Sequence, residues 1–233
     1  FVVQYKETDF AFISRLCEHL GISFFFEEKD EVDMVVFTDS SWGFQAIGDG
    51  EVPFQGRGEK GGVYELVREA QVVPSHFVQR DYNYRNPGTD LLAEDSFEGF
   101  GGGVVEYGGH FKDPDEGKGL AILRRQEREC RQLLYRGRAA DPQLSAGHRV
   151  SITGNTYGDV EVLPIEVHYR CVQPSRSGQA TPEAFHSRFE ATPAGLTFRP
   201  DRKTPRPRIQ GVLTGIVDSA GPGEYADIDD WGR

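Results

Sequence analysis

Apolar and polar residues at the start of the chain alternate with the spacing of one short amphipathic helix. Between residues 8 and 20, apolar side chains recur every three or four positions, at Phe10, Ile13, Leu16, Cys17 and Leu20. Thr8 can cap this helix, Asp9 adds a favourable negative charge to its first turn, and Gly21 can end it. We therefore expect a helix whose apolar stripe is buried against the strands that follow.

The spacing then changes to the two-residue period of β strands. Residues 22–28 and 33–39 predict a hairpin, whereas residues 43–62, which are rich in glycine and charge, predict a loop. Pro164 interrupts a later apolar run and indicates an edge strand or a bulge there. Further strands are predicted at residues 63–73, 77–84, 133–139, 149–153, 159–172 and 184–192.

A second helix is predicted over residues 117–134. Its apolar side consists of Leu120, Leu123, Cys130 and Leu134. Its opposite side is heavily charged and consists of Arg124, Arg125, Arg128, Glu129 and Arg131. Two helices among about ten strands predict a mainly β, or β-rich α+β, fold. We expect a barrel-like domain with the second helix packed on its outside or at one end.

The composition changes after residue 198. Residues 199–208 contain three prolines and five basic residues, so they are expected to be extended and semi-rigid. We interpret them as a Pro/Arg linker that needs only solubility and stiffness, with binding of an acidic partner as the alternative. The predicted organisation is a helix-hairpin segment at 1–62, a β-barrel-like domain at 63–198, the linker at 199–208 and the truncated start of another domain at 209–233.

Charge and apolar content narrow the functional classes. The chain has 233 residues and a net charge of −11, which argues against a nucleic-acid-binding protein. Its longest apolar runs, at residues 24–26 and 34–37, are far shorter than the ~20 residues of a membrane-spanning helix. The three cysteines, Cys17, Cys130 and Cys171, are widely spaced, which favours buried reduced thiols over a disulfide or a zinc site.

We predict no catalytic, cofactor-binding or metal-binding residues. The sequence lacks a nucleophile elbow, an H-E-x-x-H helix, a phosphate-binding P-loop and paired C-x-x-C motifs. His168 and His186 could form a metal site with a carboxylate, but ordinary surface histidines are the favoured interpretation. Acidic residues near the end of the chain lack the glycine and distal glutamate of a calcium loop and predict a solvated turn; they are Asp227, Asp229 and Asp230.

Two further features have structural interpretations. The glycines at 101–103 could hold a phosphate only ahead of a helix, and a strand-like stretch follows them, so a flexible loop is expected. A β-rich glycan hydrolase would need paired carboxylates, but Glu161 and Glu166 lie five positions apart on one predicted strand and should face opposite sides. A free-standing binding module is the remaining alternative.

Several motifs together resemble one family. Residues 4–26 read Q-Y-K-E-T-D-F-A-F-I-S-R-L-C-E-H-L-G-I-S-F-F-F. This motif is similar to the Q-Y-x-E-x-D-x-x-F-x-x-R-L-x-E-x-x-G-I-x-x-x-F signature of VgrG proteins, the spike-and-hub proteins of type VI secretion. Later motifs match the family in the same order, at residues 81–87, 144–154, 198–211 and 230–233. Asn155 departs from the family, which often has His there, and residues 218–225 lack its usual G-P-x-G-E wording.

The resemblance implies a structural role and no enzymatic activity. In such families the hub is a trimer that docks on a hexameric, Hcp-like tube protein and carries an OB-fold and a membrane-puncturing needle. On this template the chain would hold the latter part of the phage-tail hub region and the truncated start of the OB-fold. Effector cargo and a spike-tip protein are implied as further partners, and no cofactor or nucleic acid is.

The resemblance also implies where such a protein works. It would assemble in the cytoplasm and then be secreted, or delivered into a target cell, by contraction of the machine, without stable membrane insertion of this segment. The family covers type VI secretion systems and related contractile injection machines, so the baseplate hub of a contractile phage tail remains an alternative.

Overall fold

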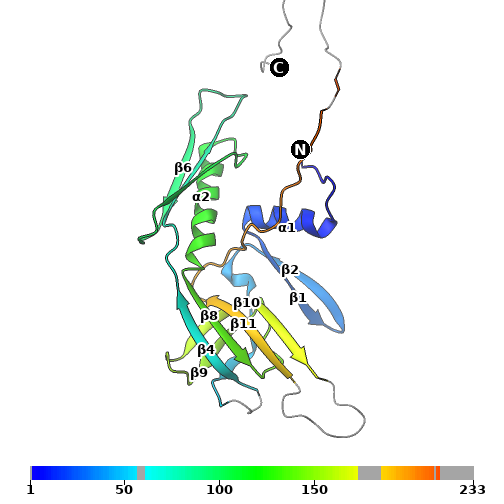
Figure 1. The fold of residues 1–233 in the computed structure, drawn as a ribbon, viewed down its shortest axis with the longest axis vertical. Helices are drawn as coiled ribbons and strands as arrows, with labels where there is room; N and C mark the ends of the chain where they lie inside the picture. Colours follow the sequence, from blue (N-terminus) through cyan, green and yellow to red (C-terminus); the bar gives the residue numbers. More distant parts are fainter. Residues whose placement is uncertain (1, 57–60, 173–184, 213, 216–233) are drawn as a thin grey trace, which may run out of the picture.

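The described part of the chain is mainly β, as predicted. A computed structural model describes residues 2–56, 61–172, 185–212 and 214–215. These residues form two α helices, a short 3-10 helix η1 (Ser41–Gly43) and eleven strands. The strands make a two-stranded hairpin, a six-stranded sheet and a three-stranded sheet (Figure 1). None of the described helices is long and apolar enough to cross a membrane.

The first helix, α1 (Asp9–Leu20), has the predicted ends. The Thr8 side chain accepts a hydrogen bond from the Ala11 N–H, and Gly21 ends the helix in the left-handed conformation. The predicted burial of its apolar stripe was wrong: Phe10 is 66% exposed, Ile13 and Leu20 are exposed, and Leu16 is half-buried. The neighbouring hairpin has only two strands and is too narrow to cover the stripe. Of the predicted stripe only Cys17 is buried, and the other buried side chain of α1 is the polar Ser14.

The predicted hairpin is confirmed as β1 (Ser23–Lys29) paired with β2 (Val32–Thr38). Its two faces differ. Phe25 points inward and packs in a small core with Phe44 and Leu163, whereas its neighbour Phe26 lies on the exposed face. The hairpin is therefore attached to the rest of the molecule through its inner face.

The six-stranded sheet has the order β3-β9-β10-β11-β8-β4 and contains the main core. A bridge between Phe54 and Val63 joins the ends of its two edge strands, so the sheet curls toward a barrel. Residues on its inner side are fully buried, among them Val63, Ile152 and Val162. Its strands are β3 (Ala46–Pro53), β4 (Val63–Ala70), β8 (Leu133–Ala139), β9 (Arg149–Thr153), β10 (Val160–Cys171) and β11 (Phe185–Pro193).

Strand β3 lies where a loop was predicted, so the loop assignment of residues 43–62 was wrong. The strand runs parallel to β9, with an irregular register between Ala46 and Glu51 that spans two glycines. Those glycines made the segment look like a loop in the sequence. The division of the chain at residue 62 stays a prediction, and the sheet also uses residues before it.

The predicted bulge at Pro164 is confirmed by a register shift between Pro164 and Glu166. Val162 and Val167 both pack on the same core, although residues five positions apart on a regular strand face opposite sides. The bulge therefore reverses which residues of β10 face the core. The prediction that Glu161 and Glu166 face opposite sides was therefore wrong. Both carboxylates are exposed; Glu161 pairs with Arg149 at 3.5 Å, and Glu166 bonds to His168 at 2.6 Å.

The third sheet has the order β6-β5-β7 and is covered by helix α2. Its strands are β5 (His76–Asp81), β6 (Leu91–Ser96) and β7 (Gly103–Tyr107). Helix α2 (Pro114–Glu129) begins earlier than predicted, at the Asp113 cap, and ends before Cys130. Leu133 and Leu134 belong to β8, so the predicted helical extension to residue 134 was wrong. Helix α2 and its sheet lie beyond one end of the six-stranded sheet (Figure 1).

Candidate functional site

The candidate site lies where the C-terminal arm, residues 198–206, passes between the two helices. Figure 1 shows this arm leaving the six-stranded sheet and passing between the lower end of α2 and α1. The arm joins no sheet, and its side chains supply most of its contacts. The interpretation that this stretch needs only solubility and stiffness was therefore wrong. Most of the predicted OB-fold start at 209–233, with Asp227, Asp229 and Asp230, falls outside the described residues.

The arm begins with an aromatic and a cationic anchor. The Phe198 ring lies 6.2 Å from the Phe44 ring. Arg199 donates from Nη1 to the Gly21 carbonyl oxygen at 2.9 Å, and from Nε to the Gln126 side chain at 2.8 Å. A single arginine therefore joins the end of α1 to α2.

Arg202 binds two glutamates. Its Nη1 and Nη2 atoms donate to the two Glu106 oxygens at 3.0 and 2.5 Å, and its Nε donates to Glu127 Oε2 at 3.1 Å. Burial alone would raise the pKa of Glu106, but the hydrogen bonds and charge of Arg202 outweigh it and lower that pKa. Burial likewise acts to lower the pKa of Arg202, and the hydrogen bonds and charges of Glu106 and Glu127 raise it above its usual value. The arm thus docks on α2 and β7 through a bidentate ion pair.

Two charged residues of α2 are buried beneath the arm. Arg124, which the sequence placed on the charged side of this helix, is 3% exposed, and Glu127 is 1% exposed. Arg124 Nη1 lies 3.4 Å from Glu127 Oε2, and Arg124 Nε lies 3.7 Å from Glu106 Oε2. Burial, followed by the nearby charge of Arg202, lowers the pKa of Arg124 to about 10. These residues can be buried because β7 and the arm bring opposite charges to them.

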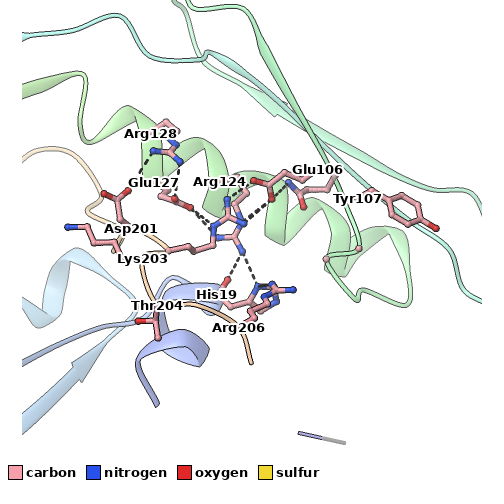
Figure 2. Close-up of a pocket in the computed structure, with 14 residues that line it drawn as sticks. His19, Glu106, Tyr107, Arg124, Glu127, Arg128, Asp201, Lys203, Thr204 and Arg206 are labelled. Carbon is pink, nitrogen blue, oxygen red and sulfur yellow. Dashed lines mark hydrogen bonds and ion pairs between the residues drawn. The ribbon is translucent and has the colours of Figure 1, made fainter. Parts of the chain in front are cut away.

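His19, at the end of α1, completes the cluster (Figure 2). Its Nδ1 lies 3.2 Å from Nη2 of Arg124 and 3.3 Å from Nη2 of Arg206. Because a guanidinium only donates, Nδ1 must accept, and the ring is neutral with its proton on Nε2. Burial, together with the charges of Arg124, Arg206 and Arg202, lowers the pKa of His19 to about 4.

Glu18, next to His19 at the end of α1, also holds the end of the arm. The Thr204 N–H and hydroxyl both donate to the Glu18 carboxylate, at 2.9 and 2.8 Å. Further back along the arm, Asp201 lies 3.1 Å from Arg131 Nε and 3.7 Å from Arg128 Nη1. The acidic partners of the basic arm are therefore residues of this same chain.

These groups surround a cavity of about 640 Å³. Its walls come from α1, β5, β7, α2 and the arm, and they carry five cationic side chains and three carboxylates. The cationic ones are Arg124, Arg128, Arg202, Lys203 and Arg206, and the acidic ones are Glu106, Glu127 and Asp201. No cluster of three or more His, Cys, Asp or Glu among the described residues is arranged to hold a metal ion. The geometry joins segments through hydrogen-bonded charges.

The histidines and cysteines that the sequence raised as site candidates lie elsewhere. His168 and His186 are on adjacent strands, opposite Arg188 and Arg170 respectively. Each histidine thus has an arginine as its cross-strand neighbour, and His168 Nε2 lies 2.6 Å from the Glu166 carboxylate. All three cysteines are free thiols; Cys17 and Cys130 are buried and Cys171 is exposed.

Sequence reasoning missed the charged cluster under the arm. Glu106 is a single charged residue between Val105 and Tyr107 in β7, and a charged residue in a strand ordinarily faces solvent. Arg124 and Glu127 lie three apart on α2, which indicates a surface ion pair. The one available signal was the basic run at 199–208, for which binding to an acidic surface was the alternative interpretation.

Comparison with known proteins identifies the class. Residues 1–175 match the phage tail baseplate hub (GPD) family, and the chain belongs to this family. The predicted resemblance is thereby confirmed. The type VI secretion system spike protein VgrG5 of Pseudomonas aeruginosa is 28% identical, over 100% of this chain and 32% of its own length. VgrG3 of Vibrio cholerae, also a type VI secretion system spike protein, is 24% identical, over 100% of this chain and 24% of its own length. The chain thus spans about a third or less of these relatives.

Solved structures share the fold. A type VI secretion component of E. coli, the c3393 protein, is described as similar to the bacteriophage T4 tail proteins gp27 and gp5; it matches with a TM-score of 0.58 and 19% identity, over 90% of this chain and 44% of that one. The 43 kDa tail protein of prophage MuSo2 from Shewanella oneidensis matches with a TM-score of 0.56 and 11% identity, over 82% of this chain and 56% of that one. At these identities the likeness establishes the fold alone, and it agrees with the predicted hub-like β fold.

Proposed function

We propose that the chain is a structural hub segment of the spike of a type VI secretion system or a related contractile injection machine. The observation that carries the proposal is the family match over residues 1–175, together with relatives that are themselves named spike proteins. The charged cluster is consistent with this role, because it holds separate segments together and places an extended arm between them. In this role the protein acts by assembly and force, and it is not an enzyme.

The proposed partners follow from the hub role. The full-length protein would be a homotrimer that docks on the hexameric, Hcp-like tube protein and carries the membrane-puncturing needle. Effector cargo and a spike-tip protein would attach beyond this segment. The protein would assemble in the cytoplasm and leave the cell, or enter a target cell, when the sheath contracts.

The baseplate hub of a contractile phage tail is the second candidate function. The fold match to a prophage tail protein favours it, and the two machines share a contractile principle. A hub in either machine would use the same assembly surfaces.

Deletion of the encoding gene in its own bacterium tests the proposal. We expect export of the tube protein into the medium to stop, and to resume when the gene is restored on a plasmid. Unchanged export would contradict the secretion role. Loss of phage particles after DNA damage, with tube export unchanged, would instead establish the phage function.

A second measurement addresses catalysis. The purified chain should not turn over peptidoglycan, peptide or ester substrates at a saturable rate. Saturable turnover that a single substitution in this chain abolishes would overturn the purely structural role.

A further inference from the structure

We propose that the cavity under the arm binds a small oxyanion of the phosphate type at its His19 end, against Arg206 and His19 and over the buried guanidinium of Arg124. This goes beyond the proposed function, which requires no ligand. The bound anion would lie where α1, α2 and the arm meet, so it would help to hold the arm against both helices.

The walls of this cavity carry more positive charge than negative charge. They contain five cationic side chains and three carboxylates, and His19 is neutral. The cations therefore exceed the carboxylates by two, in a chain whose net charge is −11. A positively charged recess in an acidic protein concentrates anions at that place.

The His19 end of the cavity has too few hydrogen-bond acceptors for its donors. Nη2 of Arg124 and Nη2 of Arg206 lie 3.2 and 3.3 Å from the same atom, Nδ1 of His19. A neutral imidazole has one acceptor nitrogen, with one lone pair, so it accepts fully from only one of the two arginines. Arg124 Nη2 also donates to the His19 carbonyl oxygen at 2.8 Å. Arg206 has no other hydrogen bond or ion pair in the described part of the chain.

The carboxylates nearby are already shared between two other arginines. Glu106 and Glu127 accept hydrogen bonds from Arg202 at 3.0 and 3.1 Å. The same two side chains lie 3.7 and 3.4 Å from the buried Arg124, whose Nε makes no hydrogen bond. Two carboxylates thus balance Arg124 and Arg202 together, and the charge of Arg206 is left without a carboxylate partner. An anion beside Arg206 would supply both the missing charge and the missing acceptor.

The opposite end of the cavity is less suited to an anion. Glu127 Oε1 and Asp201 Oδ1 are buried there without hydrogen bonds, 3.6 and 3.7 Å from Arg128. Their negative charges would repel an anion at Arg128. At the His19 end, by contrast, the Arg206 side chain is exposed and can be reached from solvent.

His19 gives the site a measurable signature. Burial and the charges of Arg124, Arg206, Arg202 and His110 together lower its pKa from 6.5 to about 4. A bound dianion offsets these positive charges and stabilises the protonated ring. Occupation of the site should therefore raise the pKa of His19 toward its ordinary value.

Isothermal titration calorimetry of the purified chain with inorganic phosphate, at neutral pH and constant ionic strength, tests the site. We expect saturable binding of one phosphate per chain. The cavity of about 640 Å³ also has room for a larger molecule that carries a phosphate. Phenyl phosphate separates these two sources: equal or weaker affinity than that of phosphate indicates the free anion, and tighter binding indicates the carried group.

Two arginine variants test where the anion binds. Arg206→Gln should weaken phosphate binding at least about tenfold, because a charged hydrogen bond to the anion is lost. Arg208→Gln is the matched control, since Arg208 is exposed, lies two positions further along the chain and does not line the cavity. It removes the same charge and should leave the affinity unchanged. Both side chains are exposed, so neither substitution should unfold the protein.

A nuclear magnetic resonance titration of the His19 ring, with and without sulfate, places the anion beside that residue. Sulfate keeps its double negative charge over the whole range of the titration, and chloride at the same ionic strength is the reference. We expect the His19 midpoint to rise from about 4 in chloride to a higher pH in sulfate. In Arg206→Gln the difference between the two salts should be much smaller.

Three results would overturn the site. They are the absence of saturable phosphate binding, equal affinities for the Arg206 and Arg208 variants, and a His19 midpoint that is the same in sulfate and chloride. These measurements use purified protein and do not involve tube export, so failure of the anion site leaves the gene-deletion test of the proposed function unaffected.

Discussion

Arg202 and Glu106 are 96 positions apart in the chain, yet they form a bidentate ion pair at 3.0 and 2.5 Å. The same arginine reaches Glu127, which is buried on α2. The last described segment of the chain is thus attached to residues from its middle. The arm is part of the folded hub, and changes in the arm should be felt in the stability of the hub.

Replacing Glu127 should be strongly destabilising. In Glu127→Ala the buried Arg124 loses its neighbouring carboxylate, and breaking one partner of a buried ion pair costs about 3–5 kcal/mol. Urea denaturation followed by circular dichroism measures the free energy of unfolding. Glu98→Ala, at an exposed loop position, is the control and should stay within about 0.5 kcal/mol of the wild type. Equal losses of unfolding free energy in the two variants would show that the buried cluster contributes nothing to the stability of the hub.

Two adjacent phenylalanines should respond very differently to truncation. Phe25 is 8% exposed, and its ring lies 5.8 Å from the Phe44 ring. Phe25→Ala should therefore cost about 3–5 kcal/mol, the usual range for a buried phenylalanine. Phe26 is 61% exposed, so Phe26→Ala should cost less than about 1 kcal/mol. Urea denaturation measures both changes in the free energy of unfolding. A larger loss for Phe26→Ala than for Phe25→Ala would mean that the opposite face of the hairpin points inward.

His19 should titrate far below an ordinary histidine. Its pKa is lowered to about 4 by burial and by the neighbouring arginines. Between pH 4 and 6.5 the unfolded chain then binds more protons at this site than the folded chain does. The contribution of His19 to stability is fully present above pH 6.5 and is lost as the pH falls toward 4.

A nuclear magnetic resonance titration of the His19 ring measures this directly. We expect a midpoint near 4 and a proton on Nε2 throughout the neutral range. In His19→Gln, which keeps an acceptor for Arg124 but does not titrate, stability should fall less between pH 6.5 and pH 4 than in the wild type. A His19 midpoint near 6.5 would contradict the buried, neutral ring.

Gly147 lies directly against the Phe25 ring. It has φ +85°, and a Cβ atom there would lie 2.4 Å from the Phe25 ring. Gly158 has almost the same φ, +83°, but nothing lies within 4 Å of its Cβ position. Both alanine variants carry the cost of a left-handed residue, about 1–2 kcal/mol, and Gly147→Ala should lose further stability through the clash. Equal melting temperatures for the two variants would contradict the close packing of Gly147 on Phe25.

Local signals predicted much of the fold. The ends of α1 followed from Thr8 and Gly21, and the strands β8 to β11 followed from alternation over residues 133–192. These features depend on neighbours within a few positions, which a pattern can record. Strand β3 was not predicted, because its partner β9 is parallel to it and about 100 residues away in the sequence. Its own glycines favoured a loop.

The candidate site could not be predicted for a related reason. Charge on one side of a helix ordinarily means a solvated surface, and α2 carries both signs of charge on that side. Arg124 and Glu127 are buried because the arm, some 75 residues later, covers them with Arg202. The sequence of α2 shows which of its residues are charged. It does not show that a segment far along the chain supplies the partners of those charges.

The backbone amide of Thr204 provides the most direct test that the arm is part of the hub. Its N–H donates to the Glu18 carboxylate at 2.9 Å, across 186 positions of sequence. Hydrogen exchange read at single-residue resolution should show this amide protected in the wild type, and exchanging freely in Glu18→Ala. Exchange of the wild-type Thr204 amide at the rate of an unstructured peptide would contradict the docked arm and would make residues 198–206 a free linker.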